Sequence, residues 1–423
     1  MTQRVETSCC IVGGGPAGMV LALLLARMGV DVIVLEKHAD FLRDFCGDTV
    51  HPSTLEIMYE LGILDEFLRR PHQEIREASA QIGQDTIPMI DLRHLPTHCK
   101  FVAMMPQWEF LDFISEHAAT YPTFHLKMQA EATDLIQEND HVRGVIAKTP
   151  EGPLEVRARL VIGADGRRSV MRERAGLRVI QLGAPMDVFW MRISRVPSDP
   201  TESLGRIDRG HMFVMINREE YWQCAYLIPK GSADEVRQKG IEAFQRSILE
   251  IAPFLDERVT ELTDWNHVSL LTVAVDRLEK WHKSDLLCIG DAAHAMSPIG
   301  GVGINLAIQD AVATANLLGT ILLQRAPSES ELATVQQRRI FPTRVTQGFQ
   351  VFAQNHVIRR VLTSDPNKDK PMRAPWFMKL FVRFPFLRRI PARMLGVGVR
   401  PEHVRTPDFN VQDARRKSPQ RFS

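Results

Sequence analysis

"CCIVGGGPAGMVLALLLARMGVDVIVLEKH", residues 9–38, places three glycines between a short apolar run and a longer one. The first run, residues 9–12, predicts a buried strand of a parallel sheet. Pro16 suits the first turn of a helix and Gly29 suits its end, so a helix is expected between them. Residues 31–35 then predict a second strand, and the whole stretch predicts a βαβ unit.

The glycine spacing of this unit is typical of a dinucleotide-binding turn, because Gly13, Gly15 and Gly18 form the pattern G-x-G-x-x-G. Such glycines permit a tight turn, let a pyrophosphate approach the backbone, and let helix and strand pack closely. The helix N-terminus would face the phosphates, and Glu36 is placed to bind a ribose. A plain glycine turn in a core is the alternative, and spacing alone does not choose between NAD and FAD. The predicted cofactor-binding residues of this stretch are Gly13, Gly15, Pro16, Ala17, Gly18, Glu36 and Lys37.

Two distant segments favour FAD. Residues 160–172 read "LVIGADGRRSVMR", and residues 286–306 read "LLCIGDAAHAMSPIGGVGINL". Each also fits a buried strand followed by a polar turn. Taken together and in this order, the three motifs resemble those of group A flavin-dependent monooxygenases, the para-hydroxybenzoate hydroxylase-like family. "GDTVHPSTLEIM" (47–58) and "PQWEFLDFI" (106–114) resemble further flavin-contacting segments of that family.

This resemblance implies roles for individual residues. Glu36 would bind the adenosine ribose, Asp291 the flavin-side hydroxyls, and Gln107 the ribityl-phosphate region. Asp165 would support both FAD and NAD(P)H, and Arg172 would brace its turn. A helix beginning after Gly303 would direct its N–H groups at the negative charge of reduced flavin. The further cofactor-binding residues implied are Arg43, Gln107, Asp165, Arg172, Gly290, Asp291, Pro298, Gly301, Gly303, Ile304 and Asn305.

One position departs from the family pattern. An arginine commonly precedes the "GDTVHPST"-like stretch, and here the residue is Cys46, with Arg43 as a possible substitute. Sequence drift or an engineered change is the preferred explanation, and a covalent cysteinyl–flavin bond is the alternative. His51 in the same stretch is a candidate for proton transfer, since a histidine pKa is readily tuned near neutrality.

The resemblance implies an α/β fold: a Rossmann-like FAD-binding domain, a β-sheet substrate domain and a C-terminal helical segment. Residues 211–231 predict two antiparallel strands joined near residues 217–220, and residues 233–251 show helical spacing. The predicted bounds are 1–75, 101–180 and 277–340 for the FAD-binding domain, 76–100 and 181–276 for the substrate domain, and 341–423 for the helical tail.

Alternating side chains on the two predicted strands are candidates for the substrate pocket, although they also suit an ordinary core. These candidates are Phe213, Met215, Tyr221 and Gln223. The resemblance suggests an arginine that grips a carboxylate, but only Arg218 in the turn is a loose counterpart. Apolar lining therefore favours a neutral aromatic or polycyclic substrate.

Composition narrows the class of protein. The formal net charge of +1 gives no sign of a nucleic-acid partner. Six cysteines without a CxxC pair indicate reduced thiols and a cytoplasmic location. No metal-ligand spacing, signal peptide or membrane-spanning run is recognised. The stretch 374–405 mixes aromatic residues with arginines; packing over the lobe interface is the preferred interpretation, and contact with a membrane surface is the alternative.

The resemblance implies an FAD-dependent monooxygenase that uses NAD(P)H and O2 to hydroxylate or epoxidise its substrate through a C4a-hydroperoxyflavin. Three alternatives stay open: a flavin halogenase, a flavin-dependent dehydrogenase or reductase, and a non-catalytic flavin-fold binding protein. The halogenase signature WxWxIP is not reproduced, since "WQCAYLIP" at 222–229 has the wrong spacing. The oligomeric state, the substrate and the choice between NADH and NADPH are not predicted.

Overall fold

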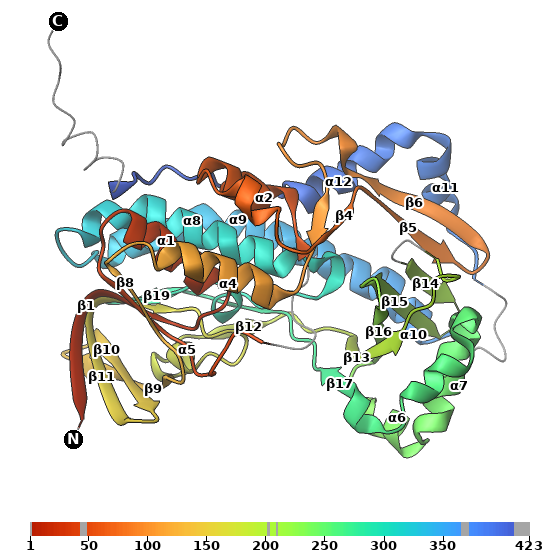
Figure 1. Ribbon diagram of the computed structural model, residues 1–423, viewed down its shortest axis with the longest axis horizontal. Coiled ribbons are helices and arrows are strands. Elements are labelled where there is room, and N and C mark those ends of the chain that lie inside the picture. Colours follow the sequence, from red (N-terminus) through yellow and green to blue (C-terminus); the bar gives the residue numbers. More distant parts are fainter. Residues whose placement is uncertain (1, 43–48, 201–203, 209, 365–371, 410–423) are drawn as a thin grey trace, which may run out of the picture.

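The computed structural model describes residues 2–42, 49–200, 204–208, 210–364 and 372–409. Its elements form two lobes, each built around one large sheet, with long helices running beside them (Figure 1). Arg43 and Cys46 lie outside the described residues, so the predictions made for them are not addressed by the structure.

The sheet of the first lobe has β1 at its centre, with β2 and β11 paired parallel to it on either side. The strand order is β19-β20-β11-β1-β2-β8, and β10 and β9 extend from β11. The predicted βαβ unit is confirmed, but β1 begins at Gln3, well before the apolar run. The strands are β1 (Gln3–Val12), β2 (Val32–Leu35), β8 (Phe124–Lys127), β9 (Glu131–Glu138), β10 (His141–Thr149), β11 (Gly152–Gly163), β19 (His282–Lys283) and β20 (Leu286–Cys288).

Helix α1 (Pro16–Arg27) fills the centre of this lobe. All of its residues from Ala17 to Ala26 are buried, because the helix packs against α4 (Gln107–Ala118) and α8 (Val302–Leu322) as well as the sheet. This explains why its sequence is apolar on every side. The other helices of the lobe are α2 (Pro52–Glu60), α3 (Leu64–Phe67), α5 (Val170–Arg174) and α9 (Glu329–Ala353).

The second lobe contains a sheet of order β17-β13-β16-β15-β14-β5-β6. The predicted hairpin is confirmed, with its turn at residues 218–220. The early segment within 76–100 joins this sheet, because β5 pairs in parallel with β14. Helices α6 (Ala233–Gln238) and α7 (Ile241–Ile251) cover one face. The strands are β5 (Glu77–Ile82), β6 (Asp85–Asp91), β13 (Met186–Ser194), β14 (Leu204–Asp208), β15 (His211–Asn217), β16 (Tyr221–Pro229) and β17 (Val268–Leu271).

Two small sheets connect the lobes. They consist of β3 (Thr49–Val50), β7 (Val102–Met104) and β4 (Gln73–Ile75), and of β12 (Val179–Gln181) and β18 (Asp276–Leu278). All of these strands except β3 lie at or near the predicted boundaries of the two domains. The exact bounds stay a prediction.

The C-terminal part does not begin at a break in structure. Helix α9 continues through residue 340, so the predicted boundary there falls inside a helix. After α10 (Arg359–Leu362), the helices α11 (Trp376–Arg383) and α12 (Arg389–Gly396) pack on β6. None of the helices in the described ranges combines the length and the apolar character needed to cross a bilayer.

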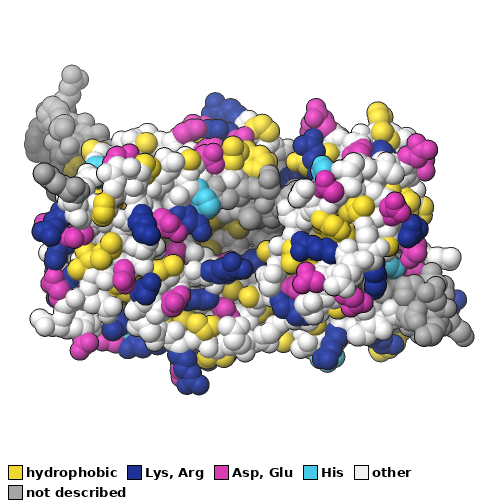
Figure 2. All heavy atoms as spheres, turned by 90° about the horizontal axis from the view of Figure 1, so that it is seen from below, with side chains coloured by type: hydrophobic (Ala, Val, Ile, Leu, Met, Phe, Trp, Pro, Cys, Tyr) yellow, Lys and Arg dark blue, Asp and Glu magenta, His cyan; other side chains and the backbone are white. Residues whose placement is uncertain are grey.

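The face shown in Figure 2 carries Lys, Arg, Asp and Glu side chains intermixed. It is hollowed near its middle. A surface with both signs interspersed agrees with the low net charge and offers no extended basic track for a polyanion.

Candidate functional site

The three motif glycines of the first turn differ in what surrounds them. A Cβ on Gly13 would lie 2.3 Å from the carbonyl oxygen of Ala164, and a Cβ on Gly18 would lie 2.0 Å from that of Gly13. A Cβ on Gly15 would meet nothing within 4 Å. Gly13 and Gly18 are therefore required by internal packing, and Gly15 leaves the backbone open to a ligand, as the motif predicts.

The carboxylate of Glu36 is held at the end of β2. It accepts hydrogen bonds from the backbone N–H of Gly14 at 2.9 Å and of His38 at 3.0 Å. The side chain is buried, so its oxygens keep one orientation beside the glycine turn. This arrangement suits a carboxylate that must accept hydrogen bonds from a polar ligand.

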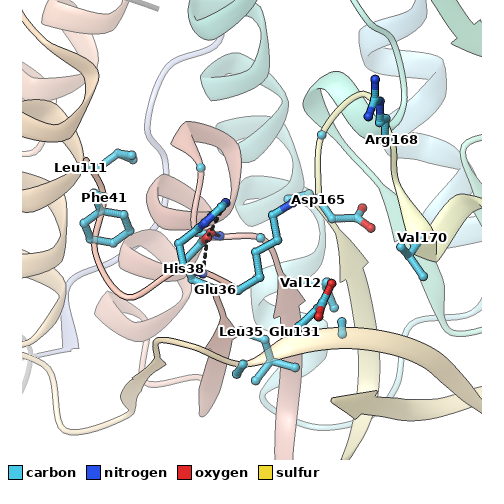
Figure 3. Close-up of a pocket in the computed structure, with 18 of the residues that line it drawn as sticks. Val12, Leu35, Glu36, His38, Phe41, Leu111, Glu131, Asp165, Arg168 and Val170 are labelled. Carbon is cyan, nitrogen blue, oxygen red and sulfur yellow. Dashed lines mark hydrogen bonds and ion pairs between the residues drawn. The ribbon is translucent and has the colours of Figure 1, made fainter. Parts of the chain in front are cut away.

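Glu36 and the glycine turn border a cleft of about 260 Å³. Figure 3 shows Glu36 and His38 on one side of the cleft and Asp165 and Arg168 on the other. Of the predicted site residues, the cleft brings together Gly13, Gly15, Glu36, Lys37, Gln107 and Asp165. The sequence did not single out His38, Phe41, Leu111, Ala130, Glu131, Ala132, Arg168 or Val170, which also line it.

Asp165 holds its own turn together. It accepts hydrogen bonds from the hydroxyl of Ser169 at 2.5 Å and from the backbone N–H of Met171 at 3.1 Å. Burial raises the pKa of this carboxyl, while these hydrogen bonds oppose the rise. Arg172 donates to the carbonyl of Arg167 and to Asp276, so it braces the turn as predicted and does not line the cleft.

Asp291 lies outside this cleft, at the junction with the turn that carries Asp165. Its carboxylate accepts a hydrogen bond from Arg167 Nε at 3.1 Å and is about one third exposed. The preceding glycine, Gly290, has φ of +59° and lies against Ala17 and Ala307. The sequence did not single out Arg167, although it stands next to the Asp165-Gly166 pair.

The glycine-rich turn before α8 is fixed by Asn305. The side chain of Asn305 accepts hydrogen bonds from the backbone N–H of His51 at 2.9 Å and from the hydroxyl of Thr54 at 2.7 Å. It also donates to the carbonyl of Gly301 at 3.3 Å. Helix α8 begins at Val302, two residues earlier than predicted, and its N-cap residue Gly301 adopts a left-handed conformation that glycine tolerates. The first N–H groups of α8 are therefore those of residues 302–305.

The geometry of His51 does not suit the predicted role in proton transfer. Its side chain is buried, and Nδ1 donates to the carbonyl of Leu395 at 2.8 Å. Burial lowers the pKa of His51 to about 4, so the ring is neutral at physiological pH. The prediction assumed a tunable, accessible ring, and it is revised to a structural contact between α2 and α12.

The substrate candidates lie on opposite faces of the second sheet. Phe213 and Met215 are fully buried against α7, which corrects their predicted place in a pocket. Tyr221 and Gln223 lie on the other face, with Ala225 and Leu227. The alternation of side chains along β15 and β16 predicts which residues share a face of the sheet. It does not predict which of the two faces α6 and α7 cover.

The face opposite α7 has an apolar part and a polar edge, and Val351 of α9, Leu362 of α10 and Ile358 between these helices pack on the apolar part. Ile299 of the glycine-rich turn, like Val214 and Trp190, packs against the buried cluster of this apolar part. At the polar edge, Arg218 Nε donates to Gln223 Oε1 at 3.0 Å, and the guanidinium of Arg192 lies 3.8 Å from the centroid of the Tyr221 ring. The face therefore combines an apolar surface with hydrogen-bonding groups next to the turn that precedes α8.

The model of the FAD binding domain family matches residues 6–348. The chain belongs to this FAD-binding family. It is 32% identical over 339 residues to 6-methylpretetramide 4-monooxygenase of Streptomyces rimosus, covering 79% of this chain and 80% of that protein. Para-nitrophenol 4-monooxygenase of a Pseudomonas species is 23% identical over 350 residues, covering 78% and 82%. The solved structure of an anhydrotetracycline hydroxylase from Streptomyces rimosus has a TM-score of 0.70 at 21% identity, covering 93% and 76%.

Membership of the FAD-binding family confirms the predicted resemblance and fold class. The chain is an FAD-dependent oxidoreductase of the monooxygenase type, with NAD(P)H as the reductant. Its relatives do not favour the halogenase and reductase alternatives.

The residues that line the cleft, together with Asp291, fit FAD. The open backbone at Gly15 allows close approach of a phosphate, and a similar opening exists at Gly166. Glu36 presents a fixed carboxylate, and Asp291 presents a partly exposed one. The chain therefore supplies backbone for phosphates and carboxylates for hydroxyl groups, which is the donor and acceptor set that a flavin dinucleotide needs.

Proposed function

We propose that this chain oxygenates a neutral aromatic or polycyclic small molecule bound at the face of the second sheet opposite α7, beside the turn that precedes α8. The observation that carries the proposal is the packing of Ile299, in the turn before α8, against that apolar face. Relatives named for 6-methylpretetramide and para-nitrophenol support a phenolic or polycyclic substrate. Gln223, Arg218 and Tyr221 provide polar groups at its edge for a ring hydroxyl or carbonyl.

We assign the cofactor roles as follows. Gly15 and the N-terminus of α1 would hold the phosphates, and Glu36 the adenosine ribose. Asp291 would hold hydroxyl groups nearer the flavin, with Arg167 orienting its carboxylate through a hydrogen bond. The N–H groups of residues 302–305 would stabilise negative charge that develops on the ring system.

FAD, when bound, accepts hydride from NAD(P)H and activates O2 for transfer to the substrate. The residues of this chain hold the substrate and exclude water from the reacting atoms. Trp190, Val214 and Ile299 would provide the water-excluding surface, and Gln223 would orient a polar group of the substrate. No proton transfer is assigned to His51, because its ring is buried and bound to Leu395.

The main experiment measures NAD(P)H oxidation by the FAD-loaded protein with a panel of phenolic and polycyclic compounds. Mass spectrometry then follows label from ¹⁸O₂ into the product. We expect some of these compounds to stimulate NAD(P)H oxidation and to gain one labelled oxygen atom. Stimulation that yields only hydrogen peroxide, or a product formed equally without oxygen, would contradict the proposal.

The assignment of Asp291 has a separate test. We expect Asp291→Ala to purify with at least about tenfold less FAD, because a charged hydrogen-bond acceptor is lost. Asp234→Ala on α6 is the control, since Asp234 is highly exposed in the other lobe. A fully yellow Asp291→Ala protein would show that this carboxylate does not hold the cofactor.

The predicted cytoplasmic location also remains a proposal. It is supported by the five cysteines among the described residues, Cys9, Cys10, Cys99, Cys224 and Cys288, which are all free and buried.

A further inference from the structure

Residues 372–395, which include α11 and all of α12 except its last residue, form an outer layer over the edge of the second sheet (Figure 1). The inner side of this layer is packed. Met378 and Ala374 contact Ile82 and Ile87 of the hairpin formed by β5 and β6. The backbone N–H of Ala374 also donates to a carboxylate oxygen of Asp85 at 3.1 Å. The layer is therefore attached to the sheet, and its outer side has a defined set of exposed side chains.

The outer side, which we call the α11–α12 surface, is unusually apolar. Trp376 is 77% exposed, Ile390 61% and Phe386 59%. The other large apolar side chains exposed here are Leu380, Val382 and Phe384. Single exposed apolar residues are ordinary, but six within one short segment indicate a surface that contacts something else.

The same segment is strongly basic. Residues 372–395 contain six Lys or Arg residues and no Asp or Glu. Since the whole chain has a net charge of only +1, the rest of the chain is net acidic. The segment thus carries six positive charges and no negative one of its own. The six cations are Arg373, Lys379, Arg383, Arg388, Arg389 and Arg393.

Three of these six cations have a polar partner among the described residues, and one of those partners is a carboxylate. Arg389 Nη2 lies 3.4 Å from His94 Nε2. Among the described residues, Lys379 is the only one of the six cations with a carboxylate within 4.0 Å. Its Nζ lies 3.8 Å from Oδ2 of Asp85. Arg388 donates to the carbonyl of Phe381. Arg373, Arg383 and Arg393 are exposed. Their charges are therefore available to an external anion.

We propose that the α11–α12 surface binds the anionic headgroup region of a phospholipid bilayer. Its aromatic and aliphatic side chains would insert at the boundary between headgroups and acyl chains, while its cations contact lipid phosphates. Charge complementarity favours this partner, because the cations are interleaved with the apolar residues along the whole segment. A protein partner would instead have to match both features with one fixed acidic and apolar patch. The contact is peripheral, since no described helix spans a bilayer.

The first experiment is flotation of the FAD-loaded full chain with vesicles. We compare phosphatidylcholine vesicles with vesicles in which one third of the lipid is phosphatidylglycerol, at low and at high salt. We expect binding to the anionic vesicles to be at least about tenfold stronger at low salt and to fall at high salt. Equal binding to both vesicle types, or no binding to either, would overturn the proposal.

Two sets of variants locate the binding surface. Trp376→Ser with Phe386→Ser and Ile390→Ser removes apolar area, and Arg383→Glu with Arg393→Glu reverses charge. We expect each set to lower the bound fraction by about tenfold or more, with the FAD content unchanged. Unchanged vesicle binding by both sets would overturn the proposal.

Matched controls change the same chemistry elsewhere. Leu317→Ser with Leu323→Ser removes exposed apolar residues of α8 and its end, and Arg4→Glu with Arg178→Glu reverses exposed charges of the first lobe. We expect both controls to bind vesicles like the original chain. Sedimentation velocity adds a further test: self-association that depends on Trp376, without vesicle binding, would assign the surface to a second copy of the chain. Because these readouts need no turnover, they are independent of the proposed reaction.

Discussion

At the scale of single residues, the first glycine turn shows that two nearby glycines serve different purposes. Gly13 has φ of +107° and lies against the backbone of Ala164, whereas Gly15 has ordinary extended dihedral angles and open space beside it. The first position is needed for the fold, and we propose that the second gives access to the cofactor. The motif predicts both roles, because it reflects the geometry of phosphate binding.

This difference predicts opposite outcomes for two similar substitutions. Gly13→Ala should lower stability by about 3 kcal/mol or more, because its Cβ would clash with the backbone. Gly15→Ala should keep the Tm of the apoprotein but weaken FAD binding. Thermal unfolding and FAD titration of both apoproteins check this. A Gly15→Ala protein that binds FAD normally would show that the phosphates do not approach this residue.

His51 gives a prediction of pH dependence. Its folded pKa of about 4 lies below the usual 6.5, so the unfolded chain binds a proton more readily between these values. Stability should therefore fall as pH falls, by about 2 kcal/mol between pH 7 and pH 5 from this residue alone. The measurement is the difference in unfolding free energy between the original chain and His51→Gln at the two pH values. An identical pH dependence of the two proteins would mean that His51 is not buried in its neutral form.

At the scale of elements, the hairpin of β15 and β16 shows where sequence reasoning succeeds and where it stops. Period-two alternation correctly predicted both strands and their turn. It could not tell which face is covered by α7, because Phe213 and Val214 are both apolar and suit either side. The face is decided by the distant helices and by Ile299, which come from other parts of the chain.

Substitutions on the two faces should therefore have different effects. Phe213→Leu should reduce stability by about 1–2 kcal/mol, through lost packing against α7, and leave the KM for the aromatic substrate unchanged. Gln223→Leu should change KM by about tenfold while the Tm changes little. Unfolding curves and steady-state kinetics measured on both variants provide the check. A substrate effect from Phe213→Leu alone would place the substrate on the other face.

At the scale of the whole molecule, the end of the described chain is joined to several distant elements. Arg339 is buried between Asp310 of α8 and Glu402. Asp310 also accepts a hydrogen bond from His294, four residues after Gly290. Burial alone would raise the pKa of Asp310, but His294 and Arg339 lower it below its usual value. The sequence indicated a helical tail but could not predict this network, since its members have no shared motif and are brought together only by packing.

Glu402→Gln tests this network. We expect a loss of about 3 kcal/mol in unfolding free energy, because Arg338 and Arg339 lose a buried carboxylate partner. Glu138→Gln is the matched control, since it removes a carboxylate from an exposed pair with Arg157 and should have little effect. Denaturant unfolding of both variants measures the difference. Equal effects would show that the segment around Glu402 does not stabilise the first lobe.

The strand order of the first sheet also has a consequence for synthesis on the ribosome. The central strand β1 ends at Val12, and its neighbour β11 ends only at Gly163. Strand β11 in turn pairs with β20, which ends at Cys288. A growing chain consequently carries incompletely paired parallel strands through most of translation, and such non-local pairing is slow and prone to aggregation. On the cofactor roles proposed above, FAD is fully held only after the segment at 298–305 has emerged. We therefore expect the yield of folded protein to depend on riboflavin supply and on chaperone capacity, which act late in translation. Changes that affect only the early stages of translation should have less effect on the yield.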